Sequence, residues 1–389
     1  MIRRNHRAPL VRVACCIAVL LTCAAAGAGL PTSELLQRLP PGITAIAVID
    51  VEALLKSKLA EQEKWRSKQD VAYGSRPLMV PPEAKTVVVA AQLDPTNDLS
   101  SQWQVSLVDL ATPFTIDEIA KTEGGRVEPF GDLPAAWTPT DAYVIQFDPG
   151  LLAMAQPANR QAISRWIKFA QNNKQVAVSD YLQAAMGRLT NTSQFVLAID
   201  LADVPQRQRV EQRLAASQTV GGKEDKVKQL TDLITGVQGM TVTVGVTDKI
   251  MAEVRIDFSA DVRPLGNLAK PLLIEVLDKH DLHLSDLEGF TAELLSKSVV
   301  LRGPLSIDGL RRLGSLLEMS STKFSDLKDA KPTDSQTVIK DATLGYYRSI
   351  DKLIEDLRKT LEDTRDNHAV WMERYGRKVD ALPILNVDQ

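Results

Sequence analysis

Cysteine is nearly absent from this chain of 389 residues, and its absence excludes several kinds of site. The three cysteines all lie near the amino terminus, at Cys15, Cys16 and Cys23. If that segment is removed on export, the remaining chain can form no disulfide, cysteine nucleophile, iron–sulfur cluster or cysteine-bound zinc site. A chain of this length does not need such crosslinks, because it can bury a large apolar core.

A net positive charge is also lacking. The formal charge is −3, although residues 1–28 hold four arginines and no acid. Without that segment the chain has 42 basic and 49 acidic residues and a formal charge of −7. Binding to nucleic acid requires a basic surface, so we expect no nucleic-acid partner. Charged residues make up 24% and apolar residues 44%, which is typical of a folded chain and argues against a multi-span membrane protein.

Motifs of catalysis and cofactor binding are missing too. The chain contains no H-E-x-x-H, G-x-S-x-G or G-x-G-x-x-G motif. Gly221-Gly222-Lys223 lacks the upstream glycine of a phosphate-binding loop and is followed by Glu224. We therefore expect a protein that has no cofactor and is not an enzyme.

The amino-terminal segment has the pattern of a signal peptide. A basic stretch precedes an apolar run at 13–29, which is shorter than the roughly 20 residues of a membrane span. The run ends in two A-x-A cleavage patterns, at 24–26 and 26–28. We expect a periplasmic or extracellular protein that keeps no transmembrane anchor after cleavage. Retention of the segment as an anchor and lipidation at Cys23 are the alternatives.

The chain contains an internal repeat at a spacing of about 150 residues. Three apolar runs of the first half correspond to three of the second half, and their order is conserved. The matches are 46–55 with 195–204, 105–114 with 253–262, and 142–154 with 298–310. A single match of this kind arises easily by chance, but three in one order favour a duplication.

Each repeat is predicted to be a βαββαβ unit. The expected strands are near 43–51, 86–93, 102–110 and 141–147 in the first unit, and near 194–201, 240–247, 250–258 and 298–302 in the second. In the second unit valines alternate with threonine or glycine before a turn at Asp248-Lys249, which is typical of a hairpin. Such alternation places one strand face on a core and the other in water. The predicted fold class is α+β, with two tandem ferredoxin-like repeats, largely antiparallel sheets and a C-terminal helical tail.

Helices are expected between these strands. The predicted ranges are 52–67, 115–122, 158–171, 204–216, 226–235, 264–278 and 306–318. Within 158–171, apolar side chains follow helical spacing at Ile163, Trp166, Ile167 and Ala170. The chain is thereby divided into a signal peptide (1–28), a first repeat (29–190), a second repeat (191–319), a polar linker (320–337) and an amphipathic tail (338–389).

The tail carries an apolar stripe at helical spacing. Tyr346, Ile350 and Leu353 lie in its first part, and Trp371 and Tyr375 continue it after a polar patch. A stripe of this size must pack on something. One alternative is the chain's own sheets, and the other is a protein partner or a second copy of the chain.

Histidine is rare beyond the signal segment. The stretch DKHDLHLSD at 278–286 places His280, His283 and Asp286 at three-residue steps, on one side of a helix if the stretch is helical. Two imidazoles and a carboxylate can hold zinc or iron. No third histidine lies nearby, and the spacing is not that of a catalytic zinc site. These three residues are the metal candidates, and a solvated loop or helix end is the alternative.

Aspartates recur at the ends of predicted strands, at Asp50, Asp109, Asp200 and Asp257. A carboxylate at such a place most simply caps the turn or helix that follows. The alternative is a paired-carboxylate active site, which requires the folded chain to bring two of these residues together.

Both ends of the chain resemble one group of proteins. The stretch LPPGITAIAVIDVEALLKS (39–57) and the segment 371–388, which includes RYGRKVDALPILNVD, resemble parts of uncharacterised exported bacterial α+β proteins of similar length. The resemblance implies export and an unassigned function. It carries over no catalytic residue.

Two classes of function remain. The first is an exported, non-catalytic binding or structural protein of the cell envelope that works through sheet faces, sheet edges or the C-terminal helix. The second is a carboxylate- or metal-dependent hydrolase. A carrier of an apolar ligand between the two repeats is a third hypothesis.

We expect the exported protein to begin near Gly27 or Gly29, because the A-x-A patterns end just before these residues. Amino-terminal sequencing of the exported protein checks this cleavage site. A chain that still contains Arg12 would show that the segment is retained.

Overall fold

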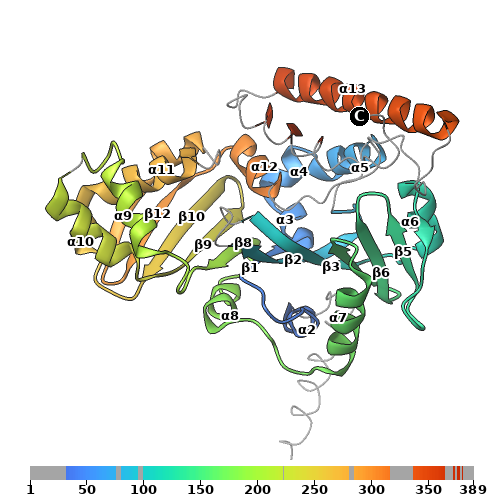
Figure 1. The fold of residues 1–389 in the computed structure, drawn as a ribbon, viewed down its shortest axis with the longest axis horizontal. Coiled ribbons are helices and arrows are strands. Elements are labelled where there is room, and N and C mark those ends of the chain that lie inside the picture. Colours follow the sequence, from blue (N-terminus) through green and yellow to red (C-terminus); the bar gives the residue numbers. More distant parts are fainter. Residues whose placement is uncertain are drawn as a thin grey trace, which may run out of the picture.

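The computed structural model describes residues 32–75, 80–94, 100–221, 223–279, 284–315 and 336–363, together with 371–372, 375–376 and 379. The predicted signal peptide, most of the predicted polar linker, and both His280 and His283 lie outside the described residues. Figure 1 shows a long sheet with helices on both of its faces.

One antiparallel sheet runs through the described part of the chain. Its twelve strands lie in the order β11-β12-β10-β9-β8-β1-β2-β3-β7-β6-β5-β4, and all neighbours are antiparallel. The strands are β1 (Ala45–Asp50), β2 (Ala84–Asp94), β3 (Ser100–Leu110), β4 (Arg126–Val127), β5 (Ala135–Thr138), β6 (Ala142–Asp148), β7 (Leu151–Gln156), β8 (Phe195–Asp200), β9 (Val237–Val246), β10 (Ile250–Phe258), β11 (Thr291–Leu295) and β12 (Ser298–Pro304).

Helices cover both faces of this sheet (Figure 1). The lower face in the figure carries α2 (Thr32–Gln37), α7 (Arg160–Asn172) and α8 (Asp180–Met186). The upper face carries α3 (Val51–Leu55), α4 (Lys58–Gln62), α5 (Trp65–Ser75), α6 (Ile116–Glu123), α9 (Arg207–Ala215), α10 (Glu224–Ile234), α11 (Ala269–Lys279), α12 (Ile307–Ser315) and the short turns η1 (Arg263–Leu268) and η2 (Ser285–Gly289).

Each face has its own apolar core. The lower core joins Val48, Leu107 and other strand residues to Trp166 of α7 and Leu182 of α8. The upper core extends along the whole sheet, from β2 and β3 to β10 and β12. The central strand β1 contributes to both cores, so the strand predicted near 43–51 is buried on its two faces.

Several predicted elements are confirmed. The hairpin of β9 and β10 has buried valines at alternating positions of β9, and its turn spans 247–249. Helix α7 buries Ile163, Trp166, Ile167 and Ala170, the four residues at helical spacing. Asn159 caps its first turn by accepting a hydrogen bond from the Ala162 backbone N–H.

The two halves of the sheet have the same strand order. From the centre outward, the first half runs β1-β2-β3-β7-β6 and the second half runs β8-β9-β10-β12-β11. The halves meet where β1 pairs with β8, and there Ala47 lies opposite Leu197. These two residues are 150 positions apart, the spacing of the repeat, so the strands are related by a local twofold axis between them.

The ferredoxin-like arrangement is not confirmed. That fold separates the first and second strands of each unit by a third strand, whereas β1 pairs directly with β2 and β8 pairs directly with β9. The prediction of four strands per unit missed β7 and β11, which pair with β6 and β12 respectively. As a result, the match of 142–154 with 298–310 aligned β6 with β12, which occupy different places in the two halves.

The C-terminal tail has an apolar cluster of its own. Helix α13 (Gln336–Asp363) runs above the upper face in Figure 1. Its buried residue Leu353 packs with Trp371 and Tyr375, and among the described residues this cluster includes none from a strand. Tyr347 on another side of α13 is 66% exposed. Among the helices that the structure describes, none is both long and apolar enough to cross a membrane.

A chain that ends at residue 335 should unfold at nearly the same temperature as the full chain, because the apolar cluster of the tail is separate from both sheet cores. Leu107→Ala is the control, since that side chain is fully buried in the lower core and its loss should cost about 2–5 kcal/mol. Thermal unfolding followed by circular dichroism compares them. A truncated chain as unstable as the Leu107→Ala variant would place the tail in a sheet core.

Candidate functional site

The lower face of the sheet is apolar from β8 to β6 and largely polar from β9 to β11, where the buried Val300 of β12 is an exception. Val105 and Leu107 of β3 belong to the lower core. Their counterparts 148 residues later are Glu253 and Arg255 of β10. Among the described residues, none from β9 to β12 belongs to the lower core. The halves therefore share a strand order and differ in this face.

The helix that follows the last strand of each half accounts for this difference. Helix α7 follows β7, and helix α12 follows β12, so they hold the same place in the repeat. Trp166 of α7 packs in the lower core, whereas Leu313 of α12 packs in the upper core. Within the ranges that the structure describes, no helix packs an apolar side on the lower face of β10, β12 or β11.

We call this uncovered surface the polar face. Its members are Thr241 of β9, Glu253, Arg255 and Asp257 of β10, Glu293 of β11, Ser298 and Arg302 of β12, and Tyr181 and Arg188 at the border with α8. The ladders place these strand residues on one side because every second residue of a strand points to the same face.

Asp257 is the centre of one hydrogen-bond network on the polar face. Its carboxylate accepts from the Ser298 hydroxyl at 2.6 Å, from the Arg255 Nε at 2.8 Å and from the Tyr181 hydroxyl at 3.2 Å. The Tyr181 hydroxyl also lies 3.2 Å from that of Thr241, and an Arg255 Nη2 donates to Ser298 at 2.6 Å. Five side chains from four elements are thereby held in one arrangement.

Glu253 is the centre of a second network. Its two carboxylate oxygens accept from Arg302 Nε at 2.7 Å and from Arg188 Nη1 at 3.3 Å. Arg302 also donates through Nη1 to Glu293 at 2.9 Å, which joins β10, β12 and β11. Because these side chains are between 21% and 57% exposed, solvent screens the pairs, and their main effect is to position the charges.

The electrostatics of the polar face are balanced. Three carboxylates (Glu253, Asp257, Glu293) accompany three guanidinium groups (Arg188, Arg255, Arg302). The hydrogen bond that Arg302 donates to Glu253 raises the pKa of Arg302 above its ordinary value. Burial raises the pKa of Tyr181, and the negative charge of Asp257 adds to this increase. Tyr181 is therefore a neutral hydrogen-bond donor at physiological pH.

The other recurring aspartates do not gather with Asp257. Asp50 caps α3 by accepting from the Ala53 backbone N–H at 2.8 Å, as the capping hypothesis predicted. Asp200 accepts from the Ala202 N–H at 3.0 Å and so closes a turn. Asp109 is buried within β3. Of the four, Asp257 is the one whose partners are side chains of the polar face.

Of the metal candidates, the structure describes Asp286, while His280 and His283 lie outside the described residues. Asp286 accepts from the Ser306 backbone N–H at 2.9 Å and from its hydroxyl at 3.0 Å, just before α12. Across the described ranges, no group of three or more histidine, cysteine, aspartate or glutamate residues is placed to hold a metal ion.

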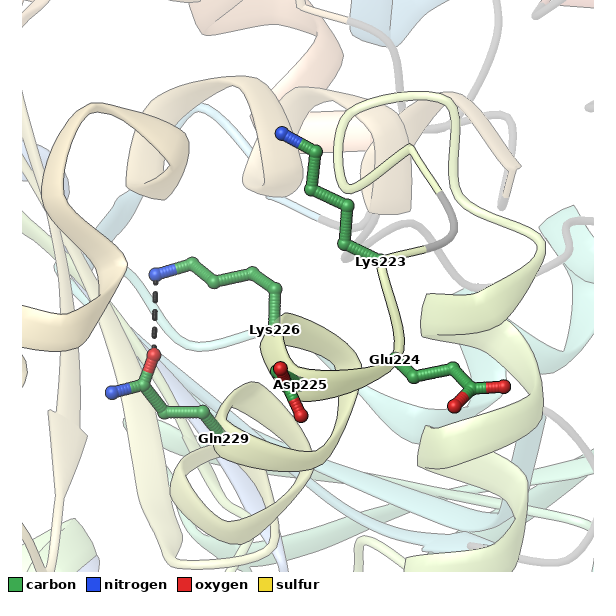
Figure 2. A pocket seen from close by; sticks show the side chains of 5 residues that line it. All are labelled: Lys223, Glu224, Asp225, Lys226 and Gln229. Carbon is green, nitrogen blue, oxygen red and sulfur yellow. Dashed lines mark hydrogen bonds between the residues drawn. The ribbon is translucent and has the colours of Figure 1, made fainter.

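A shallow depression lies at the start of α10 (Figure 2). It has a volume of about 720 Å³ and is lined by Lys223, Glu224, Asp225, Lys226 and Gln229. Lys226 Nζ donates to the Pro264 carbonyl at 2.6 Å and to Gln229 at 3.3 Å, and Lys223 and Glu224 point away from each other in Figure 2. The polar groups do not converge on a ligand, so the polar face is the stronger candidate.

Most of the polar face was not predicted from the sequence. Asp257 was singled out there, but Tyr181, Arg188 and Arg302 were not. One signal could have found Arg188: Arg38-Leu39 recurs as Arg188-Leu189 at the repeat spacing of 150 residues. Arg38 pairs with Asp148 in the first half, and Arg188 pairs with Glu253 in the second.

Comparisons with known proteins give a distant fold likeness. No protein-family model and no curated protein matches this sequence. Among solved structures, crystal forms I, III and IV of TP0453 resemble the chain at 9–10% identity, with TM-scores of 0.40–0.43. The alignments cover 72% of this chain and 95–97% of those chains. A likeness of this size supports no inference about activity or site residues.

Gly239→Ala should destabilise the protein, because a Cβ at this place in β9 would overlap the Tyr181 ring and the Ile199 carbonyl. We expect the free energy of unfolding to fall by about 1–3 kcal/mol. Gly314→Ala in α12 is the matched control, since nothing lies within 4 Å of its added Cβ, and it should gain about 0.5–1 kcal/mol. Urea unfolding measures both. Equal stability of the two variants would mean that Tyr181 does not cover β9.

Proposed function

We propose that this chain is an exported, non-catalytic binding protein of the cell envelope that recognises a protein partner through the polar face. The observation that carries the proposal is a sheet face with ordered charges and no covering helix among the described residues. In the first half the equivalent face is covered by α7. We therefore expect the polar face of the second half to have a role other than packing a helix of its own chain.

The charge of the polar face favours a protein surface as the ligand. Its three acids and three arginines are held in fixed positions by side-chain hydrogen bonds. Charges of both signs at fixed positions select a partner with the complementary pattern, and they give specificity more than raw affinity. Nucleic acid and anionic lipid carry negative charge only, so the three carboxylates of the polar face would repel them.

The geometry around Asp257 supports binding rather than hydrolysis. Ser298 donates to Asp257 and is 4% exposed, so its hydroxyl is not presented to a substrate. Asp257 accepts from three side chains, which uses most of its capacity to act as a base. The hydrolase hypothesis would gain support from stoichiometric zinc or iron in the purified protein.

The proposed location follows from the amino-terminal pattern. A basic segment, an apolar run at 13–29 and two A-x-A patterns support export to the periplasm or beyond. The confinement of the cysteines to this segment is compatible with an oxidising compartment, because the exported chain would carry no free thiol.

The two halves are proposed to be copies of one unit. Their common strand order and the pairing of Ala47 with Leu197 support a duplication. The tail adds a second candidate surface for a partner or for self-association, because Leu344, Tyr347 and Ile354 of α13 are exposed. A lower apparent mass of a chain that ends at residue 335 would support self-association through the tail.

Photo-crosslinking in cells tests the polar face. Met251 lies on the same side of β10 as Glu253 and is 38% exposed, so a photoreactive residue there should form a discrete protein adduct. The same residue at Val276 of α11, which is 50% exposed, is the control and should form none. Arg302→Glu should abolish the Met251 adduct. The substitution reverses the positive charge that lies between the carboxylates of Glu253 and Glu293, and with it the charge pattern that the partner would recognise.

Equal labelling from Met251 and Val276, or an adduct that persists in the Arg302→Glu variant, would contradict the proposal. The melting temperature of that variant should fall only slightly, since Arg302 is half-exposed and each of its two surface pairs contributes about 0–1 kcal/mol.

A further inference from the structure

The two edges of the described sheet differ in what they offer. The β4 edge has two residues, and Arg126 stacks over the Trp137 ring with its guanidinium carbon 4.1 Å from the ring centre. The β11 edge has five residues, of which Thr291, Ala292 and Glu293 are exposed. A long exposed edge carries unpaired backbone groups that can pair with another chain.

Hydrogen bonds between β10 and β12 determine which groups of β12 are available to β11. The Phe258 N–H donates to the Lys297 carbonyl at 2.8 Å, and the Leu305 N–H donates to the Ile250 carbonyl at 3.0 Å. Odd-numbered residues of β12 therefore bond to β10, and even-numbered ones bond to β11, because backbone groups alternate in direction along a strand.

The same alternation determines which groups of β11 point away from the sheet. Arg302 and Val300 of β12 lie opposite Thr291 and Glu293, so these two residues of β11 bond inward. Ala292, between them, directs its N–H and its carbonyl outward. One donor and one acceptor at the centre of the exposed stretch are thus free of the sheet ladder.

The first half of the chain shows what such an edge can hold. Strand β6 has the same place as β11, and its outer edge is paired with β5. Val105 of β3 and Glu253 of β10 hold equivalent places in the two halves. When the strand pairing is followed outward from each of them, Val144 of β6 and Ala292 of β11 also hold equivalent places. Val144 lies opposite Ala136 of β5.

The pairing of β5 uses the outward groups of β6. The Gln146 N–H of β6 donates to the Pro134 carbonyl, just before β5, at 2.9 Å. Gln146 and Val144 have the same direction because they are two residues apart. The edge groups that hold β5 in the first half are therefore the counterparts of groups of β11 that pair with no strand of the described sheet.

We infer that β11 binds an extended segment of a partner protein as an additional antiparallel strand over Thr291–Glu293. The inference deepens the proposed function, on which it rests, because the added strand would extend the polar face. Ile145, the counterpart of Glu293, lies opposite Ala135 of β5, so the partner's residue at that position lies opposite Glu293.

The charge of Glu293 determines the chemistry of that residue. The Glu293 side chain is 57% exposed, and it forms an ion pair with Arg302 of β12, on the inner side of β11. A lysine or arginine directly across the strands would pair with it, since oppositely charged cross-strand neighbours stabilise a sheet. A second copy of β11 centred on Ala292 would instead place two Glu293 side chains at diagonal positions, where they repel.

A peptide with the sequence of β5 provides the test. The probe spans residues 133–140 with lysine in place of Ala135 and carries a fluorescent label, and its binding to the full chain is measured by anisotropy. Saturable binding is expected. Ala292→Pro should weaken it by about tenfold or more, because proline removes the outward N–H. The variant should still fold, since that N–H takes no part in the ladder with β12.

Two further variants make the test specific. Val127→Pro is the matched control at the opposite edge, where Glu128 rather than Val127 bonds to β5, and it should leave peptide binding unchanged. Glu293→Lys should weaken binding of the lysine peptide, and a peptide with glutamate at that position should restore it. If the glutamate peptide does not restore binding to the Glu293→Lys variant, the predicted register is wrong.

The remaining outcomes separate this inference from the proposed function. If the peptide does not bind, or binds the Ala292→Pro variant equally well, strand addition is wrong, whereas the Met251 adduct still tests the polar face. If the Met251 adduct is absent but the peptide binds as expected, the polar-face proposal fails alone. A dimer of the full chain that Ala292→Pro converts to monomer would identify a second copy as the occupant and overturn the partner assigned here.

Discussion

The antiparallel pairing of β1 with β8 is the contact on which the rest of the sheet depends. Ala47 lies opposite Leu197, and both strands are enclosed between apolar side chains. The described strands are added outward from this pair in the same order on both sides as far as β6 and β11, and β5 and β4 extend the first half alone. Water is excluded from both faces at the centre, so these backbone hydrogen bonds are among the least exposed of the fold.

The symmetry of the strands does not extend to the helices. Helix α7 buries Trp166 beneath the first half, while α12 buries Leu313 above the second. Among the described residues no helix covers this face of β10, so its side chains must be satisfied in another way, and its charges pair with Arg302 of β12 and with Arg188 just after α8. In the described part of the sheet, β11 likewise lacks the neighbouring strand that β5 provides to β6.

Local elements were predictable because their signals are contained in short stretches. The alternation in β9 and β10 and the helical spacing in α7 each depend on fewer than about fifteen neighbouring residues. Strands β7 and β11 were missed: Leu151–Gln156 lies directly between another apolar strand and a helix, and Thr291–Leu295 is short and largely exposed. Periodicity does not name the partner of a strand, so the ferredoxin-like order was an analogy rather than a consequence of the pattern.

The sequence by itself determined the repeat spacing, the amphipathic character of its helices and strands, and the absence of cysteine chemistry beyond the amino-terminal segment. It also identified Asp257, although as a capping residue. Only the tertiary structure decided that Asp257 meets Tyr181 and Ser298, which are 76 and 41 residues away along the chain. Contacts at such separations depend on strand order and on the face that each helix covers, and these follow from packing of the whole chain rather than from any local preference.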